Sequence, residues 1–525
     1  MKISDSQNPG AISRPRFLRR LGLFAEIILL GALILVTRCA NFTNVFVDGK
    51  IYFVDADCYS RMTRARMVVE HPGLVIRHEN FEKFPIGVNP HTTAPFDYLI
   101  AGLTSLLAPL TAQPLDLAGA LISPLLALAG GWFLCWWVLR MGFRYRWAAP
   151  GLFALSPILA HGTALGRPDH QSLLIVLVLV ALAAEWTLQE ISSRGWSIVS
   201  GLAWGFALWV SLYEPLLIFA TLLLFRRSRM FARARWVGWA FCGAILLLAA
   251  IVERRLPELP PAALAQFFTR WSSTIGELHP VSLTNPVWLQ WCGLAIVIAP
   301  VLIFFALRSK KISPAFVALL ALTFVLTIWQ ARWSYFFVIV FALVLPALFE
   351  FVRQRWLGNF LLAISLLPCL LFWRATLWPN DQLFSDRAAQ NLESAEWRAA
   401  ATMIAREKPG AFLAPWWLSP EVAYWSGQPG VAGSSHESLG GIVASARFFA
   451  SDQPNESREI LRARGVRWVL VYDGARVAEN SAAILGAPVS AKALCFLLDR
   501  TPSRAPAFLE LAGQTSSCKI YAVRN

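Results

Sequence analysis

Four acidic residues beside apolar segments are the side chains of this sequence best placed to do chemistry. Asp55 and Asp57 lie in "FVDADCYSRMTRAR", Asp169 lies in "GRPDHQSLL", and Glu277 lies in "TIGELHP". Two carboxylates at one membrane face can hold a hard divalent cation, because Mg²⁺ and Mn²⁺ prefer oxygen ligands in near-octahedral geometry. We therefore predict a cation site built on Asp57 and Asp169.

His170 and Gln171 follow Asp169 directly and could supply a further ligand to the cation. Each acidic residue taken alone is also explained as a solvated loop carboxylate or a helix N-cap. Asp169 stands immediately before "HQSLLIVLVL", which is a natural N-cap position. Short Asp-x-Asp pairs are common, so Asp55 and Asp57 carry little information by themselves.

Two further features could bind a substrate. Arg332 in "WQARWSYFF" stands at the outer end of two apolar segments. It fits either an interfacial anchor, whose long side chain reaches the headgroups, or a clamp for phosphate or pyrophosphate. Trp416 and Trp417 in "PWWLSPEVAYWSGQP" fit either an aromatic core or a binding platform for peptides and sugars. The residues alone leave both choices open.

The composition indicates which elements must position these residues. Of the 525 residues 56% are hydrophobic and 15% are charged, whereas soluble domains carry about 25% charged residues. Long apolar runs recur, and a bilayer crossing needs about 20 apolar residues, so we predict a polytopic α-helical membrane protein. The net charge of +15 comes largely from arginines in short loops between apolar runs, where membrane topology explains it. We therefore predict no nucleic-acid partner.

The apolar runs predict about eleven transmembrane helices. The predicted spans are 17–37, 116–139, 147–165, 171–189, 197–213, 215–226, 236–252, 286–307, 312–330, 333–350 and 357–373.

Basic loops give the orientation of these spans. The basic groups are Arg14, Arg16, Arg19 and Arg20, followed by "RMGFRYR" (140–146), "RRSRMFARAR" (226–235), "RSKK" (308–311) and "RQR" (353–355). All of them fall on the side of the N-terminus, which the positive-inside rule makes cytoplasmic. Segment 96–111 is apolar enough to cross, but a crossing there would move the later basic loops to the other side. We predict that it lies on or dips into the outer face, within one external loop spanning 38–115.

The chain changes character after residue 374. Residues 375–525 are more polar and contain "GVRWVLVYDG", which predicts a buried strand ending in a turn. We therefore predict a membrane domain over 1–374 and an extracytoplasmic mixed α/β domain over 375–525. In an oxidising compartment, Cys495 could form a disulfide with Cys518, and Cys39 could form one with Cys58.

The motifs, in order, resemble those of the catalytic subunit of oligosaccharyltransferase and its single-subunit bacterial and archaeal counterparts, which are GT-C-type glycosyltransferases. "DCYSRMTRARMVVEHPG" is similar to the first acidic motif, and "FPIGVNPHTTAPFDYLIAGL" to an aromatic-Pro-x-Gly stretch later in the same loop. "RPDHQSL" resembles the second acidic motif, and "TIGE" resembles the bacterial Thr-Ile-x-Glu motif. "PWWLSPEVAYWSGQPGVA" is similar to the Trp-Trp-Asp motif. The resemblance covers essentially the whole chain.

The resemblance implies a role for each residue of the cation site. Asp57 is expected to bind Mn²⁺ or Mg²⁺ and to face the acceptor, and Asp169 to be the second metal ligand. Gln171 stands at the third position of the second acidic motif, with His170 between the two. Catalysis is expected to rest on Asp57 together with Glu277.

The donor and acceptor sites follow in the same way. Arg332 is expected to bind the pyrophosphate of a polyprenyl-pyrophosphate glycan. Glu277, in the external loop 253–285, is expected to close over the acceptor, and Trp416 and Trp417 to lie near its hydroxyl residue. An asparagine amide is a weak nucleophile, because its lone pair is conjugated. The carboxylates of Asp57 and Glu277 are expected to bind its N–H groups and disturb that conjugation.

The sequence departs from the family in three respects. Leu418 stands where the Trp-Trp-Asp motif has its aspartate, and leucine cannot accept the hydrogen bond that reads the acceptor's Ser or Thr hydroxyl. Gln171 is a neutral ligand, which is expected to weaken metal binding. About eleven spans are predicted, fewer than the family's thirteen.

Three functions therefore remain. The first is an oligosaccharyltransferase that acts on protein asparagine, and the second is a related GT-C enzyme with a lipid or glycan acceptor. Leu418 favours the second, and the Thr-Ile-x-Glu motif ending at Glu277 favours the first. The third is a transporter or flippase, which usually has charges near the bilayer midplane and repeat symmetry, and neither is evident. The expected location is a bacterial inner membrane, with the N-terminus in the cytoplasm and the C-terminal domain in the periplasm.

Overall fold

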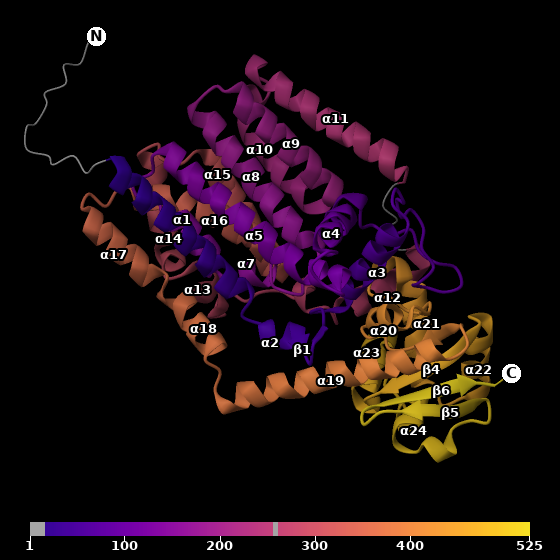
Figure 1. Cartoon of the computed structure of the whole chain (residues 1–525). Helices are drawn as coiled ribbons and strands as arrows, with labels where there is room; N and C mark the ends of the chain where they lie inside the picture. The colour runs from indigo at the N-terminus through magenta and orange to yellow at the C-terminus, as the bar shows by residue number, and fades with distance from the viewer. Residues whose placement is uncertain (1–15, 256–260, 525) are drawn as a thin grey trace, which may run out of the picture.

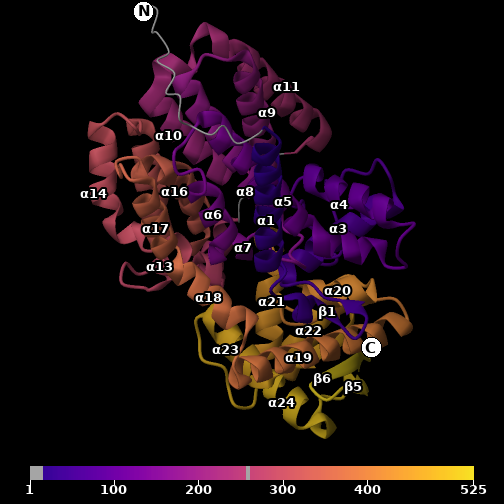
Figure 2. The same cartoon turned by 60° about the vertical axis from the view of Figure 1, so that its left-hand side comes forward.

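The computed structural model describes residues 16–255 and 261–524. Arg14 lies outside these residues, and the side chains of Arg16, Arg19 and Arg20 are likewise outside what is described. The chain forms a large helical bundle, with a small sheet and its helices packed at one end of it (Figures 1 and 2). This confirms the predicted fold class: a helical membrane protein with a C-terminal mixed α/β domain.

Five helices are long and apolar enough to cross a bilayer, or six if one bent pair counts as a span, among the described residues. The five lie in α1 (Arg16–Arg38), α5 (Pro114–Met141), α8 (His170–Glu190), α11 (Trp236–Glu253) and α16 (Ser334–Phe349). Every residue of α16 is buried, so this helix is the centre of the bundle.

The remaining predicted spans are shorter or interrupted. They are α6 (Ala148–Leu155), α7 (Pro157–His161), α9 (Arg194–Val210), α10 (Tyr213–Met230), α13 (Val287–Cys292), α14 (Ala295–Arg308), α15 (Pro314–Trp329), α17 (Arg355–Ser365) and α18 (Leu367–Leu377). Pro157 ends α6, since its ring cannot continue the helix, and α17 and α18 meet at 44°. The number of crossings therefore stays a prediction.

Small residues allow the closest helix pair to pack. A Cβ on Gly201 of α9 would collide with the backbone of Gly238 on α11, and one on Gly238 would collide with the backbone of Ser197. Such small residues let helix backbones approach closely in membranes.

The basic loops gather at one end of the bundle. The hydroxyl of Tyr145 donates to the carbonyl of Val352 at 2.7 Å, and Lys311 pairs with Glu350 at 2.8 Å. The loop 226–235, which includes the 3₁₀ turn η1 (Arg233–Arg235), contacts the last turns of α8 through Arg229 and Arg235. The predicted grouping of these loops is thus present in the fold.

The opposite end of the bundle carries the segments predicted to be external. These are α2 (Phe42–Val45), β1 (Phe46–Val47), β2 (Lys50–Ile51), α3 (Ala56–Glu70), α4 (Ala94–Leu107), η2 (Ala262–Leu264), α12 (Ala265–Ser272), η3 (Gly276–Leu278) and η4 (Ala331–Trp333). Arg77, between α3 and α4, donates to the carbonyls of Val252 and Glu253 at the end of α11.

The C-terminal part is a four-stranded mixed sheet with helices on both faces. The long helix α19 (Asp381–Arg406) leads into it from α18 (Figure 1). The strands are β3 (Ala411–Leu413), β4 (Val466–Tyr472), β5 (Leu509–Gln514) and β6 (Cys518–Val523), in the order β3-β4-β6-β5. The helices are α20 (Ser419–Ser426), η5 (His436–Ser438), α21 (Leu439–Ala450), α22 (Pro454–Ala463), α23 (Gly474–Leu485), α24 (Leu494–Arg500) and η6 (Pro502–Arg504).

Strand β4 is the strand that the sequence predicted, and it is an inner strand because it has a neighbour at each edge. It pairs in parallel with β3 and antiparallel with β6. Its residues alternate between two apolar clusters, with Val469 in one and Leu470 in the other. All eight cysteines are free thiols, so neither suggested disulfide forms.

Candidate active site

Asp57 is positioned by the start of α3. The Asp55 side chain caps this helix, accepting a hydrogen bond from the Cys58 amide at 3.0 Å. The cap places Asp57 in the first turn, where the helix dipole stabilises a negative charge. Asp57 is thereby held at the end of the bundle that is opposite to the basic loops.

Asp169 is positioned in the same way at the start of α8. Its side chain is the N-cap and accepts from the Gln171 amide at 3.4 Å. Nδ1 of His170 lies 2.7 Å from Oδ1 of Asp169, and Arg167 lies 4.0 Å from Oδ2. Burial alone would raise the pKa of Asp169, but His170 and Arg167 hold it well below its usual range. Asp169 is both the predicted N-cap and a fixed negative charge.

These residues line one cavity of about 220 Å³, which we call the arginine cavity. It is lined by Arg61, Arg64 and Arg332, and by all the residues predicted for metal and donor binding and for catalysis: Asp57, Asp169, His170, Gln171, Glu277 and Arg332. These lining residues come from four segments: an external loop, the start of α8, the loop after α11 and the turn between α15 and α16.

Arg332 is fixed between two carboxylates. It lies 2.7 Å from the buried Glu214 and 4.0 Å from Glu277. Two backbone hydrogen bonds hold the Glu277 loop against the Arg332 turn: Ala331 donates to the carbonyl of His279, and Val281 to the carbonyl of Ile328. The predicted pyrophosphate clamp and the predicted acceptor-binding glutamate are therefore neighbours.

Arg61 and Arg64 are cavity residues to which sequence reasoning gave no role. Both are buried on α3, and both pair with the buried Asp97, at 2.6 and 2.9 Å. Nη2 of Arg61, and Nε and Nη1 of Arg64, have no hydrogen-bond partner within the described part of the chain. The spacing of three residues, which puts two arginines on one helix face, is the signal that could have found them.

A second cavity, of about 750 Å³, lies beside the first, and we call it the tryptophan cavity because Trp397, Trp416 and Trp417 line it. Asp57, Ile275, Glu277 and Ser434 line both cavities. The side chain of Asp57 is exposed to these two spaces. Desolvation by the surrounding cavity walls raises the pKa of Asp57 above its usual range, and repulsion from Asp55 and Asp169 raises it further.

The two predicted acceptor tryptophans face this second cavity, but Leu418 does not. Trp416 donates to Asn480 at 2.9 Å and packs edge-on against Trp271. Trp417 lies under the guanidinium of Arg476, at 5.6 Å. Leu418 is fully buried in the apolar cluster on one face of the C-terminal sheet. Its side chain is a core residue and is unable to contact a cavity ligand.

The residues predicted to hold the cation line one cavity, but in the described part of the chain Asp57, Asp169 and His170 do not bring their ligand atoms within 4.8 Å of one another. Oε1 of Gln171 is buried and has no hydrogen-bond partner among the described residues. Buried acceptors are normally paired, so this amide oxygen is free to bind a ligand in the arginine cavity, which Asp57 and Asp169 also line. His170 contacts the Asp169 carboxylate and holds it in place. This contact brings His170 close to the proposed cation site.

Glu421 lines the tryptophan cavity, and its raised pKa makes the stability of the fold depend on pH. Burial raises the pKa of Glu421 from 4.5 to about 8. The folded chain therefore holds a proton that the unfolded chain releases, so stability is full below pH 4.5 and falls as the pH rises towards 8. The slope is at most about 1.4 kcal/mol per pH unit. We expect Glu421→Gln to flatten the fall in Tm between pH 5 and 8, and an unchanged slope would contradict this.

No protein-family model and no curated protein sequence matches the chain. Solved structures do match in fold. Archaeal oligosaccharyltransferase AglB from Archaeoglobus fulgidus, in complex with an inhibitory peptide and a dolichol-phosphate, has a TM-score of 0.69 at 12% identity, over 91% of this chain and 72% of that one. An Archaeoglobus fulgidus oligosaccharyltransferase complex with Zn and sulfate has a TM-score of 0.62 at 13% identity, over 95% and 73%.

A third structure is similar over nearly its whole length. ArnT from Cupriavidus metallidurans, bound to undecaprenyl phosphate, has a TM-score of 0.56 at 14% identity, over 97% of this chain and 98% of that one. These likenesses confirm that the chain has a GT-C-type membrane fold, as the motif resemblance predicted.

Proposed function

We propose that the chain is a glycosyltransferase that moves a glycan from a polyprenyl-pyrophosphate donor to an acceptor outside the cytoplasm, most directly to a protein asparagine. The observation that carries the proposal is the convergence of Asp57, Asp169, Glu277 and Arg332 on the arginine cavity. Two structures with this fold were solved with lipid phosphates, namely dolichol-phosphate and undecaprenyl phosphate.

The donor pyrophosphate would occupy the arginine cavity. Arg332 can bind its oxygens through a planar fork of donors, and the unpartnered N–H groups of Arg61 and Arg64 offer further donors. When the glycosidic bond breaks, negative charge develops on the leaving pyrophosphate. Fixed cations in a poorly hydrated site stabilise that charge without needing to reorganise.

Asp57, Asp169 and Gln171 would hold the cation, which is Mn²⁺ or Mg²⁺ by their oxygen donors. When bound, the cation acts as a Lewis acid towards the pyrophosphate. The repulsion between Asp57 and Asp169 that raises the pKa of Asp57 is relieved by a divalent charge.

The acceptor would enter from the tryptophan cavity. Asp57 and Glu277 line both cavities, so a group that reaches between them meets the donor on the far side. The two carboxylates can accept the two N–H groups of an asparagine amide and favour the rotated, unconjugated form. Resonance holds a peptide amide planar by about 18–20 kcal/mol, which sets the scale of the activation that is needed.

A second candidate is a related GT-C enzyme with a lipid or glycan acceptor. The burial of Leu418 favours it, because the position that would read a Ser or Thr hydroxyl faces the protein core. For the peptide candidate, the same burial implies that the hydroxyl residue of the acceptor contributes little to its recognition.

A transfer assay separates the two candidates. The purified chain would receive a polyprenyl-pyrophosphate glycan, Mn²⁺, and matched peptides containing Asn-x-Thr, Asn-x-Ala or Gln-x-Thr. We expect transfer to both asparagine peptides at rates within about tenfold, a difference of 1.4 kcal/mol, and none to the glutamine peptide. Transfer only to a glycolipid or free glycan acceptor, offered in parallel, would support the second candidate.

Arg332→Ala is expected to abolish donor binding and to destabilise the fold. The substitution leaves the buried carboxylate of Glu214 unpaired, which costs about 3–5 kcal/mol. The matched control is the double variant Arg332→Ala with Glu214→Gln, which removes that buried charge. We expect it to recover Tm but not donor binding, measured as retention of a fluorescent polyprenyl-pyrophosphate glycan. Recovery of donor binding would rule out Arg332 as the clamp.

We further propose the membrane placement that follows from this site. The membrane domain would end near residue 374, with residues 38–115, 253–285 and 375–525 outside the cytoplasm. The basic loops at the other end of the bundle would then face the cytoplasm, as the positive-inside rule requires. In a bacterium this corresponds to the inner membrane, with the C-terminal domain in the periplasm.

A further inference from the structure

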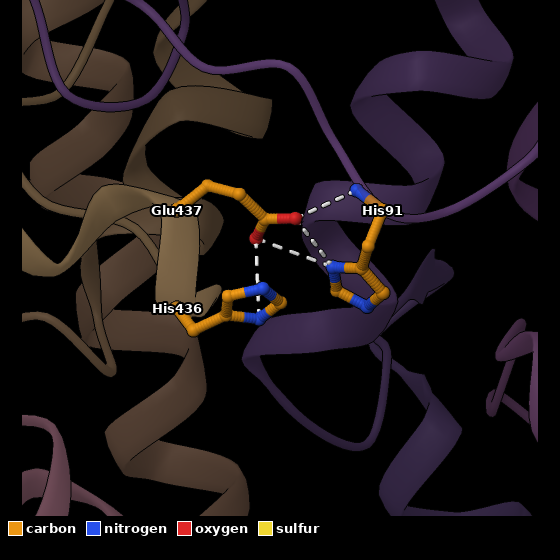
Figure 3. A group of neighbouring side chains, drawn as sticks. All are labelled: His91, His436 and Glu437. Carbon is orange, nitrogen blue, oxygen red and sulfur yellow. Dashed lines mark hydrogen bonds and ion pairs between the residues drawn. The ribbon is translucent and has the colours of Figure 1, made fainter. Parts of the chain in front are cut away.

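A second group of ligand-type side chains joins the first external segment to the C-terminal part. His91 lies between α3 and α4, and His436 and Glu437 lie in η5 (Figure 3). In the part of the chain that is described, these are the one group of three or more His, Cys, Asp or Glu residues whose ligand atoms all lie within 4.8 Å of one another. The sequence separates His91 from the other two by more than 300 residues.

The spacing of the three ligand atoms suits a metal ion. Oε2 of Glu437 lies 3.2 Å from Nδ1 of His91 and 3.4 Å from Nδ1 of His436. Zinc binds histidine nitrogen at about 2.0–2.1 Å and carboxylate oxygen at about 2.0–2.2 Å, so neighbouring ligands of a tetrahedral ion lie about 3.4 Å apart. A hydrogen bond is weak at 3.4 Å, whereas a coordination edge of that length is normal.

The Glu437 carboxylate is held ready for a ligand. Its side chain is 1% exposed. Oε1 accepts the backbone amide of His91 at 2.7 Å and lies 2.9 Å from Nδ1 of the same residue, which fixes the carboxylate against the imidazole. The buried Glu82 carboxylate is close by, accepting from Ser60 at 2.5 Å and from Ser435 at 3.1 Å. Two buried carboxylates in one region favour a bound positive charge.

The identity of the donors selects the ion. Two imidazole nitrogens with one carboxylate oxygen are a His₂Glu set, which Zn²⁺ uses in sites that keep a fourth position open. This set differs from the oxygen donors of Asp57, Asp169 and Gln171, which suit a harder ion. His91 and His436 line the arginine cavity, so a fourth ligand can reach the ion from there.

We propose that His91, His436 and Glu437 bind one Zn²⁺ ion, separate from the cation at Asp57 and Asp169, and that this ion clamps the first external segment to the C-terminal part. The proposal goes beyond the proposed transfer activity and does not depend on it, since metal binding is measured without substrate.

The test measures zinc in a chain that lacks the other proposed site. The full chain with Asp57→Asn and Asp169→Asn would be purified in detergent, stripped with a chelator, loaded with Zn²⁺ alone and analysed for metal by mass spectrometry after gel filtration. We expect one equivalent of zinc. Affinity would then be measured by competition with a chromophoric chelator.

Two variants in that background remove the ligands. His91→Asn alters a side chain that is 38% exposed, so the core is untouched and the chain should fold. We expect at least about 100-fold weaker zinc binding, beyond the usual effect of losing only a supporting partner of a ligand. His436→Ala with Glu437→Gln should lose the equivalent altogether. His78→Ala, an exposed histidine in the same external segment, is the matched control and should keep it.

Two results would overturn the proposal. One is the absence of zinc from the chain with Asp57→Asn and Asp169→Asn, which would make the three residues a hydrogen-bonded ion pair only. The other is unchanged zinc affinity in His91→Asn, which would place the ion elsewhere. The tested chain lacks the carboxylates proposed for transfer. Neither result therefore bears on the proposed transfer activity, which the transfer assay tests separately.

Discussion

Replacing Asp57 with asparagine is expected to abolish glycan transfer while leaving the chain folded. The substitution removes a proposed cation ligand and a proposed contact to the acceptor, at a residue that lines both cavities. Losing one charged contact at a reacting centre costs about 10²–10³-fold in rate, and Asp57 is proposed to make two. We expect a loss of about 10³-fold or more, measured as single-turnover transfer from a polyprenyl-pyrophosphate glycan.

Stability distinguishes this loss from misfolding. Desolvation and the neighbouring carboxylates raise the pKa of Asp57, so its charge destabilises the folded chain. Asp57→Asn should therefore keep or raise Tm, and the gain should be larger at pH 8 than at pH 5. Asp55→Asn is the control, because asparagine still caps α3 and Asp55, which pairs with Arg167 at 3.1 Å, lines the tryptophan cavity but not the arginine cavity. Its loss of transfer should be far smaller, and equal losses in both variants would contradict the role of Asp57.

Glu277→Gln is expected to stop transfer to asparagine without preventing donor binding. Glutamine keeps the size of the side chain but replaces one acceptor oxygen with an N–H donor, which repels an acceptor amide. Donor binding should persist, because Arg332 keeps its close contact with Glu214 at 2.7 Å. We expect a loss of about 10²-fold or more in the rate of transfer, with the affinity for a labelled donor within a few-fold of the original chain.

The same variant also tests which acceptor is used. A hydroxyl acceptor does not need two carboxylates around an amide, so a lipid or glycan acceptor would be glycosylated at a rate that depends on Asp57 but little on Glu277. An active Glu277→Gln chain together with an inactive Asp57→Asn chain would therefore exclude the asparagine proposal and keep the wider one.

Local rules predicted the parts of the site that depend on neighbouring residues. Asp169 directly before "HQSLLIVLVL" is the N-cap of α8, as the sequence indicated, because a short acidic side chain satisfies the free amides of a helix start. The inner strand β4 follows equally from its three valines with Trp468 and Tyr472, since β-branched and aromatic residues favour strands. The helices of the bundle likewise lie where the sequence has apolar runs, because apolar runs are also a local feature of the sequence.

Other features depend on contacts between distant parts of the chain. Glu214 pairs with Arg332, and Asp97 pairs with Arg61 and Arg64, but no local pattern selects these partners. The group of His91, His436 and Glu437 forms only when the external segment meets the C-terminal part. Such pairings are set by tertiary packing and leave no periodic trace in the sequence.

At Leu418 the motif predicted which residue of the sequence to examine, but it did not predict the surroundings of the side chain. The sequence indicated a lost hydrogen-bond acceptor at this position, and the fold adds that the side chain is part of the core, packed in the cluster that contains Val422 and Leu470. An aspartate placed there would be buried without an evident partner, which is unfavourable. The substitution Leu418→Asp alone would therefore not supply a hydrogen-bond acceptor for a Ser or Thr hydroxyl.

The most direct test of the central claim is the position of the donor pyrophosphate in a structure of the Asp57→Asn chain bound to a polyprenyl-pyrophosphate glycan. The account predicts that its oxygens lie within hydrogen-bond distance of Arg332, with the sugar anomeric carbon turned towards residue 57 and Glu277. A pyrophosphate bound outside the arginine cavity, or at the end of the bundle that carries the basic loops, would contradict it.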